Sequence, residues 1–87
     1  MYFVTMKRAG YVLFSTTPSE SIAVGLTADQ KRLHLLFREG GNWAVVREWP
    51  VEEYSHTDLM LALGKLEEPA DPKEVLRLVP TPVGMHP

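Results

Sequence analysis

The first 50 residues consist largely of short runs of β-branched and aromatic side chains separated by turn residues. Residues 2–7 and 11–16 are two such runs, and Arg8-Ala9-Gly10 between them indicates a hairpin. We expect a three-residue loop with Gly10 in the left-handed conformation, because a two-residue loop mixes apolar and polar faces. The three-residue loop instead places these side chains on one face: Tyr2, Val4 and Met6 with Val12, Phe14 and Thr16.

The next 30 residues contain one clear strand and one ambiguous segment. Ile22, Val24 and Leu26 alternate with smaller residues after the turn-rich residues 17–21, which predicts a third strand. Residues 28–39 fit a helix, since Thr27 and Gln30 have capping-box spacing and Gly40 is a typical stop. Residues 32–38 also alternate, and Glu39-Gly40-Gly41-Asn42 leads into the strand-like run 43–49, as in a hairpin. We favour the strand and keep the helix as the alternative.

The C-terminal part reads as helical. Ser55 can cap a helix over 56–66, with Asp58 at its third position and Tyr54 packing onto Leu59. A second short helical or extended piece starts at Asp71, where Pro72 takes the first helical position, and it stops before Pro80. The sequence thus predicts an α+β fold: an antiparallel sheet of four or five strands in sequential hairpins, with the C-terminal helix packed on it. Residues 1–80 would form one compact domain, and residues 81–87 a Pro-rich flexible tail.

Size and charge exclude several classes of protein. The chain has 87 residues, no cysteine, 9 Lys and Arg against 11 Asp and Glu, and a net charge of −2, so it lacks the basic excess of a strong non-specific DNA binder. The charge is uneven: residues 1–50 carry +2 and residues 51–87 carry −4. The longest run of large apolar residues and Ala, Leu59 to Leu63, is far shorter than the roughly 20 residues of a membrane span. With no signal peptide pattern either, we expect a cytoplasmic protein with no membrane association.

We find no pattern of residues that supports catalysis. The glycines form neither a phosphate loop nor a dinucleotide fingerprint. His34, His56 and His86 lie more than four residues apart from one another, and without cysteine they do not predict a metal site. Ser55, His56 and Asp58 are the residue types of a hydrolase triad, but neighbouring residues at a helix start point in different directions. We therefore expect a protein that is not an enzyme and uses no cofactor or metal.

One group of residues indicates binding. If 32–38 and 43–49 form a hairpin, one of its faces combines cations with two large aromatic side chains, and the other face is an apolar core of Leu33, Leu35, Phe37, Ala44 and Val46. The candidate binding residues on the first face are Arg32, His34, Arg38, Trp43, Arg47 and Trp49, with Leu36 and Val45 between them. Such a face is typical of protein interfaces and also suits stacking on single-stranded nucleic acid. The alternative is that Trp43 and Trp49 lie beneath helix 56–66 as part of the core.

From these observations we expect a small non-enzymatic intracellular protein that binds another macromolecule. A protein partner fits best, with the chain as an inhibitor, adaptor or regulatory subunit. The alternative is a nucleic-acid-binding domain, in which Lys31, Arg32, Arg38 and Arg47 contact phosphates and Trp43 or Trp49 stacks on a base. Association into a homo-oligomer through an open sheet edge is a further expectation, because nothing in the sequence closes the sheet.

Overall fold

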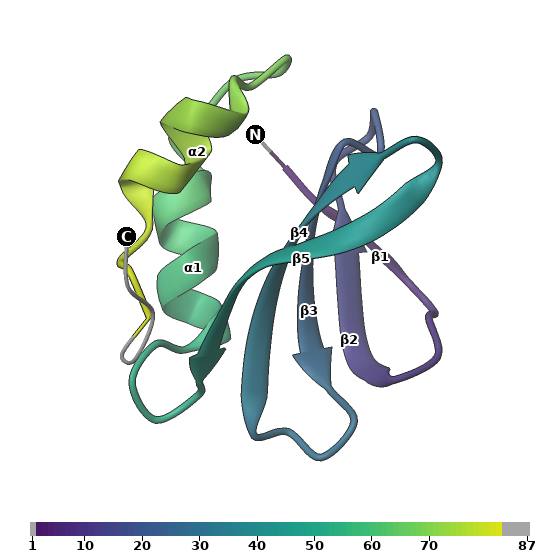
Figure 1. The fold of residues 1–87 in the computed structure, drawn as a ribbon, viewed down its shortest axis with the longest axis vertical. Helices are drawn as coiled ribbons and strands as arrows, with labels where there is room; N and C mark the ends of the chain where they lie inside the picture. The colour runs from purple at the N-terminus through teal and green to yellow at the C-terminus, as the bar shows by residue number, and fades with distance from the viewer. Residues whose placement is uncertain (1, 83–87) are drawn as a thin grey trace.

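Five antiparallel strands are followed by two helices (Figure 1). The computed structural model describes residues 2–82. The strands follow one another in the sheet in the order of the sequence: β1 (Val4–Met6), β2 (Tyr11–Thr16), β3 (Ile22–Thr27), β4 (Arg32–Glu39) and β5 (Asn42–Pro50). The helices are α1 (His56–Leu63) and α2 (Pro72–Leu78). The α+β class with an antiparallel sheet is confirmed, and the sheet has five strands.

The ambiguous segment is a strand. β4 and β5 are joined by Gly40 and Gly41, whose φ angles of 56° and 85° are those that a type I′ hairpin turn requires. The helix alternative was wrong because the capping signal at Thr27 serves a turn instead. The Thr27 hydroxyl donates to Asp29 Oδ1 at 2.7 Å and accepts from the Arg32 backbone N–H at 3.1 Å. These bonds hold the connection from β3 to β4.

The first hairpin has the predicted face at Val4, Met6, Phe14 and Thr16, but neither the predicted loop nor the predicted alternation at the start of β2. Val4 pairs with Thr16 and Met6 with Phe14, so these side chains share a face as expected. A three-residue loop would have paired Met6 with Val12; the register is instead shifted by two residues, and the loop runs over residues 7–10. Gly10 takes a φ of 90°, and the Tyr11 N–H donates to the Arg8 carbonyl at 3.2 Å. A shift by an even number leaves these faces unchanged. The alternation is broken between Tyr11 and Leu13, where the register with β3 shifts, so Tyr11 packs against Phe14 on this face.

Both helices begin at the predicted caps. The Ser55 hydroxyl accepts from the Asp58 N–H and the Asp58 carboxylate accepts from the Ser55 N–H, each at 3.1 Å, which is a complete capping box. Helix α1 ends at Leu63, three residues earlier than predicted, with Gly64 as its C-cap. Asp71 caps α2 by accepting from the Lys73 N–H at 3.0 Å.

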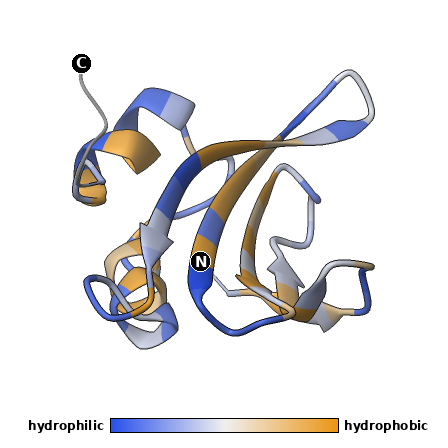
Figure 2. Cartoon of the chain, turned by 60° about the horizontal axis from the view of Figure 1, so that its bottom comes forward, coloured by the Kyte–Doolittle hydropathy of each residue, from blue (hydrophilic) through white to orange (hydrophobic). Residues whose placement is uncertain are grey.

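The main core lies between one face of the sheet and the helices. Figures 1 and 2 show α1 and α2 on the same side of the sheet. The sheet contributes Ile22, Val24, Leu33, Leu35, Phe37 and Trp49, and the C-terminal part contributes Leu59, Leu63, Leu66, Val75 and Val79. Burial of these apolar side chains is the main force that holds the helices on the sheet.

The end of the described chain is anchored to this core. The Trp49 indole N–H donates to the Pro80 carbonyl at 3.1 Å, and Pro82 is buried. Of the predicted flexible tail, residues 83–87 lie outside the described residues. Neither helix of residues 2–82 has the length and apolar character needed to cross a membrane.

Candidate functional site

The pairing of β4 with β5 is interrupted by a β-bulge. Leu35 pairs with Arg47, but Leu36 pairs with Val45, so Val46 is an extra residue on β5. An extra residue reverses which side chains of the strand face which side of the sheet. Beyond the bulge, Arg47 and Trp49 therefore lie opposite Leu35 and Leu33, on the face that the helices cover.

The placement of Trp49 on the binding face was therefore wrong. Its side chain is 1% exposed, and its ring centroid lies 4.9 Å from that of Tyr54. The indole stacks within the core beneath the helices, as the alternative interpretation expected for both tryptophans. That alternative holds for Trp49 only, because Trp43 lies before the bulge.

Arg47 was also assigned to the wrong face. It is half-buried; one guanidinium nitrogen, Nη1, donates to the Val46 carbonyl at 2.9 Å, and its Nε is buried without a hydrogen-bond partner among the described residues. An arginine held against its own strand in this way supports the bulge and does not belong to the predicted binding surface.

The other face of the sheet carries a second, smaller apolar cluster that includes no helix residue. Phe14, Ala23 and Leu36 are buried in it, and Tyr11 and Trp43 pack against them. We call this side of the sheet the open face. The side chains that define it come from the first hairpin, β3, β4 and the start of β5: Met6, Arg8, Tyr11, Phe14, Ala23, His34, Leu36, Arg38, Trp43 and Val45.

The centre of the open face is a pair of rings, each covered by an arginine. The Phe14 and Trp43 rings meet edge to face, with centroids 5.7 Å apart and planes at 80°. The guanidinium carbon of Arg8 lies 5.5 Å from the Phe14 centroid, and that of Arg38 lies 5.5 Å from the Trp43 centroid. Both distances allow a cation–π attraction. Arg38 also approaches the Glu20 carboxylate at 3.7 Å.

The contact between Phe14 and Trp43 requires a strongly curled sheet. Two strands, β3 and β4, separate β2 from β5, so these rings meet only because the sheet bends around the open face. The small residue Ala23 in β3 packs in the same cluster as these rings, and Gly25 leaves room for the ring of Tyr11 beside them. The open face is thus a concave, partly filled surface.

A chain of polar side chains runs across the same face. The Tyr11 hydroxyl lies 2.8 Å from His34 Nδ1, and His34 Nε2 lies 2.6 Å from the Glu48 carboxylate. Gly25 permits this arrangement, because a Cβ there would lie 2.5 Å from Tyr11 Cε1. Burial raises the pKa of Tyr11, and Glu48 raises it further while Arg8 opposes them. The hydroxyl is therefore neutral near pH 7 and able both to donate and to accept.

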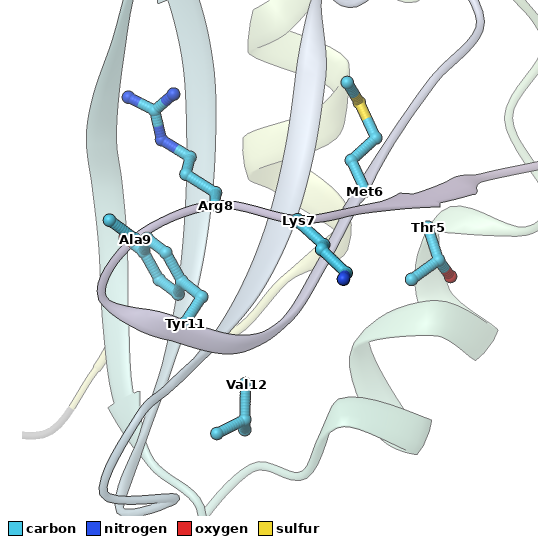
Figure 3. Close-up of a pocket in the computed structure, with 7 residues that line it drawn as sticks. All are labelled: Thr5, Met6, Lys7, Arg8, Ala9, Tyr11 and Val12. Carbon is cyan, nitrogen blue, oxygen red and sulfur yellow. The ribbon is translucent and has the colours of Figure 1, made fainter.

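Two hollows border the first hairpin. One, of about 270 Å³, lies where its loop approaches the turn between β4 and β5; its lining includes Lys7, Arg8, Phe14, Arg38 and Trp43. The other, of about 670 Å³, is wide and lies along β1 and the start of β2 (Figure 3). In Figure 3 Met6 and Arg8 point to one side of the hairpin strand, and Thr5 and Lys7 to the other.

Four of the six predicted binding residues lie on the open face. Arg32, His34 and Arg38 are separated by even numbers of positions in β4, so their side chains share one face. Trp43 pairs with Arg38 on the same face. Arg47 and Trp49 are the two exceptions. Arg32 is exposed and pairs with Pro50, at the end of the hairpin away from the rings.

The sequence interpretation missed Arg8, Tyr11 and Phe14, which the first hairpin brings to the rings. Gly25 within a strand pattern was an available signal, since such a glycine often marks the close approach of another group. Among residues 2–82, no three His, Asp or Glu side chains gather as ligands for a metal ion.

No protein-family model, curated protein or solved structure matches this chain. The open face is therefore the basis on which a function can be assigned.

Proposed function

We propose that this chain is a non-enzymatic binding protein that holds another protein on its open face. The observation that carries the proposal is the pair of packed rings, Phe14 and Trp43, each with an arginine over it, on a sheet face that no helix residue of the described chain covers. Tryptophan, tyrosine and arginine are the residues that contribute most binding energy in protein interfaces. An inhibitor, an adaptor and a regulatory subunit would all use such a surface.

Apolar exposure beside the rings supports a protein partner. Val45 is 47% exposed and Met6 is 43% exposed, and both lie on the open face. The charged side chains of Arg8, Arg38 and Glu20 line the same pocket as Met6. An apolar centre with a charged rim is the usual organisation of a protein interface.

The polar chain on this face supports binding over catalysis. A tyrosine or histidine nucleophile must be activated by a lowered pKa or an adjacent free base. The pKa of Tyr11 is raised, and both ring nitrogens of His34 are already engaged, by Tyr11 and by Glu48. These hydrogen bonds fit a structural role in which Tyr11 of the first hairpin is held against His34 of β4.

Nucleic acid is the second candidate, and the open face supports it less well. Base stacking needs a free aromatic face, whereas Arg38 lies over Trp43 and Arg8 over Phe14. Trp49, the other predicted stacking residue, is buried. Titration of the tryptophan fluorescence with single- and double-stranded oligonucleotides at low salt separates the two candidates: we expect no response, and salt-sensitive quenching would favour nucleic acid.

Affinity purification from the cells that make the protein tests the proposal. We compare the wild type, the open-face variant Arg38→Ala/Trp43→Ala, and the control variant Arg77→Ala/Leu61→Ala, which changes exposed residues on the helices. Circular dichroism checks that all three are folded. We expect the wild type and the control to recover a common protein that the open-face variant loses. Equal recovery by all three would place the partner elsewhere.

A further inference from the structure

The cationic pocket on the open face lies between the two terminal strands of the sheet. Within residues 2–82, β1 and β5 each pair with a neighbour on one side only. The pocket of about 270 Å³ is lined from the first hairpin by Met6, Lys7 and Arg8 and from the second by Gly41, Asn42 and Trp43. It is smaller than most pockets for drug-sized ligands, which hold about 300–1,000 Å³, so it suits side chains of a larger partner.

The pocket favours negative charge. Its lining includes two guanidinium groups, Arg8 and Arg38, and one carboxylate, Glu20, which stands 3.7 Å from Arg38; the Lys7 side chain points to the other side of the strand. One positive charge therefore remains in excess. The low polarity of the Phe14 and Trp43 rings beneath the guanidinium groups strengthens their attraction for an anion, because fewer waters compete for them.

The rest of the molecule is negative. Residues 51–87, which include both helices, carry −4, and the helices lie on the opposite side of the sheet from the open face. An acidic partner would be repelled by the helices and attracted by the open face. Such an uneven distribution orients a charged partner before contact.

The strand beside the pocket is open to another extended chain. Proteins usually protect edge strands with charges, prolines or bulges. β5 has a bulge at Val46, charged Arg47 and Glu48, and Pro50; β1 is short, but its residues Val4–Met6 carry no charge, proline or bulge. Val4 is 48% exposed and Met6 is 43% exposed. An extended segment with apolar residues suits this strand.

From these four observations we infer that the open face binds an extended acidic segment of the partner protein, whose carboxylates contact Arg8 and Arg38 in the pocket between β1 and β5. The inference rests on the proposed function and specifies the chemistry of the partner. Carboxylates match the planar N–H donors of arginine, and the resulting charge-assisted bonds are stronger than neutral ones.

Capped hexapeptides of alternating residues provide the test. The probe alternates aspartate with valine, and two matched peptides replace aspartate by asparagine or by lysine. Binding to the full chain is measured by calorimetry and by tryptophan fluorescence at about 20 mM salt, where electrostatic attraction is little screened. We expect the aspartate peptide to bind at least about tenfold more tightly than the asparagine peptide, and the lysine peptide not to bind.

Substitutions locate the site. Arg38→Ser should weaken the aspartate peptide about tenfold, whereas Arg77→Ser, which removes an exposed cation from α2 on the other side of the sheet, should leave its affinity within about twofold. Arg8→Ser should act like Arg38→Ser. Equal effects of Arg38→Ser and Arg77→Ser would show general charge attraction and overturn the inference.

The remaining outcomes separate the inference from the proposed function. If the aspartate and asparagine peptides bind alike, or if neither binds, the inference of an acidic partner segment is wrong. The proposed function still stands in that case if the open-face variant loses its protein partner in the affinity purification. If the chain binds oligonucleotides and Arg38→Ser abolishes that binding, both the inference and the proposed function are overturned. Sedimentation could instead show that the chain associates with itself and that Arg38→Ser abolishes this association. The open face would then bind a second copy of the chain, and the inference would be overturned.

Discussion

Trp43 and Trp49 lie on opposite faces of β5, although they are six positions apart along one strand. In a regular strand, an even separation places two side chains on the same face. The bulge at Val46 adds one residue to β5 between its pairings with Leu36 and Leu35 and reverses the alternation. One tryptophan thereby completes the core beneath the helices, and the other stands with Arg38 on the open face.

The two tryptophans should differ sharply in their effect on stability. Trp49→Ala removes a side chain that is 1% exposed, and we expect it to lower the free energy of unfolding by about 3–5 kcal/mol. Trp43→Ala removes a half-buried side chain, and we expect a loss of about 1–2 kcal/mol. Urea unfolding of both variants measures the difference. Equal losses would contradict the two-sided arrangement of β5.

Replacing Gly25 should destabilise the fold, because the ring of Tyr11 packs directly against this glycine. A Cβ at Gly25 would lie 2.5 Å from Tyr11 Cε1, so we expect Gly25→Ala to displace the ring and weaken its hydrogen bond to His34. We expect Gly25→Ala to cost about 1–3 kcal/mol of unfolding free energy.

A double-mutant cycle isolates the cause of that loss. In the Tyr11→Ala background there is no ring to displace, and the same glycine substitution should cost less than about 0.5 kcal/mol. If the cost of Gly25→Ala is the same in both backgrounds, the close contact with Tyr11 is not its origin.

His56 should make the fold less stable in mild acid. Burial lowers its pKa below the usual 6.5, and its Nε2 is buried without a hydrogen-bond partner among residues 2–82. The unfolded chain therefore binds a proton at a pH where the folded chain does not, and the free energy of unfolding falls as the pH drops from about 7 toward the folded pKa. Below that pKa this contribution changes no further.

The variant His56→Gln tests the pH effect. The difference in unfolding free energy between about pH 7.5 and pH 5.5 should be smaller in the variant than in the wild type, since the glutamine does not titrate. An identical pH dependence in the two proteins would show that His56 does not contribute.

The capping box of α1 should contribute measurably to stability. Ser55→Ala removes the acceptor for the Asp58 N–H, and we expect a loss of about 1 kcal/mol in thermal or urea unfolding. Thr57→Ala, an exposed position in the same turn, is the matched control and should be within about 0.5 kcal/mol of the wild type. A loss at Thr57 as large as that at Ser55 would argue against the cap.

Features set by neighbouring residues could be predicted from the sequence. The Gly40-Gly41 turn, the Ser55 and Asp71 caps and the alternation within β3 and β4 depend on a few adjacent side chains, and the structure contains all of them. The segment 28–39 remained ambiguous because its turn residues also resemble a helix cap. Pairing with β3 and β5 decides in favour of the strand, and that pairing is not a local property.

The candidate site was only partly predictable for the same reason. Val45, Val46 and Arg47 carry no glycine or other local signal of a bulge, so an unbroken alternation put Arg47 and Trp49 on the wrong face. The ring contact between Phe14 and Trp43 depends on the curl of the whole sheet, which no pair of adjacent strands specifies. Arg38 and Trp43, directly paired beside a two-residue turn, were correctly placed together.

Site-specific photocrosslinking tests most directly whether the open face is the binding surface. A benzophenone amino acid replaces Val45 on the open face or, as the matched control, Leu61 on α1; both positions are exposed, at 47% and 68%. After irradiation in the cells that make the protein, we expect the Val45 variant to form a covalent product with one protein, and the Leu61 variant to form none with it. A product at Leu61 and none at Val45 would contradict the assignment of the open face.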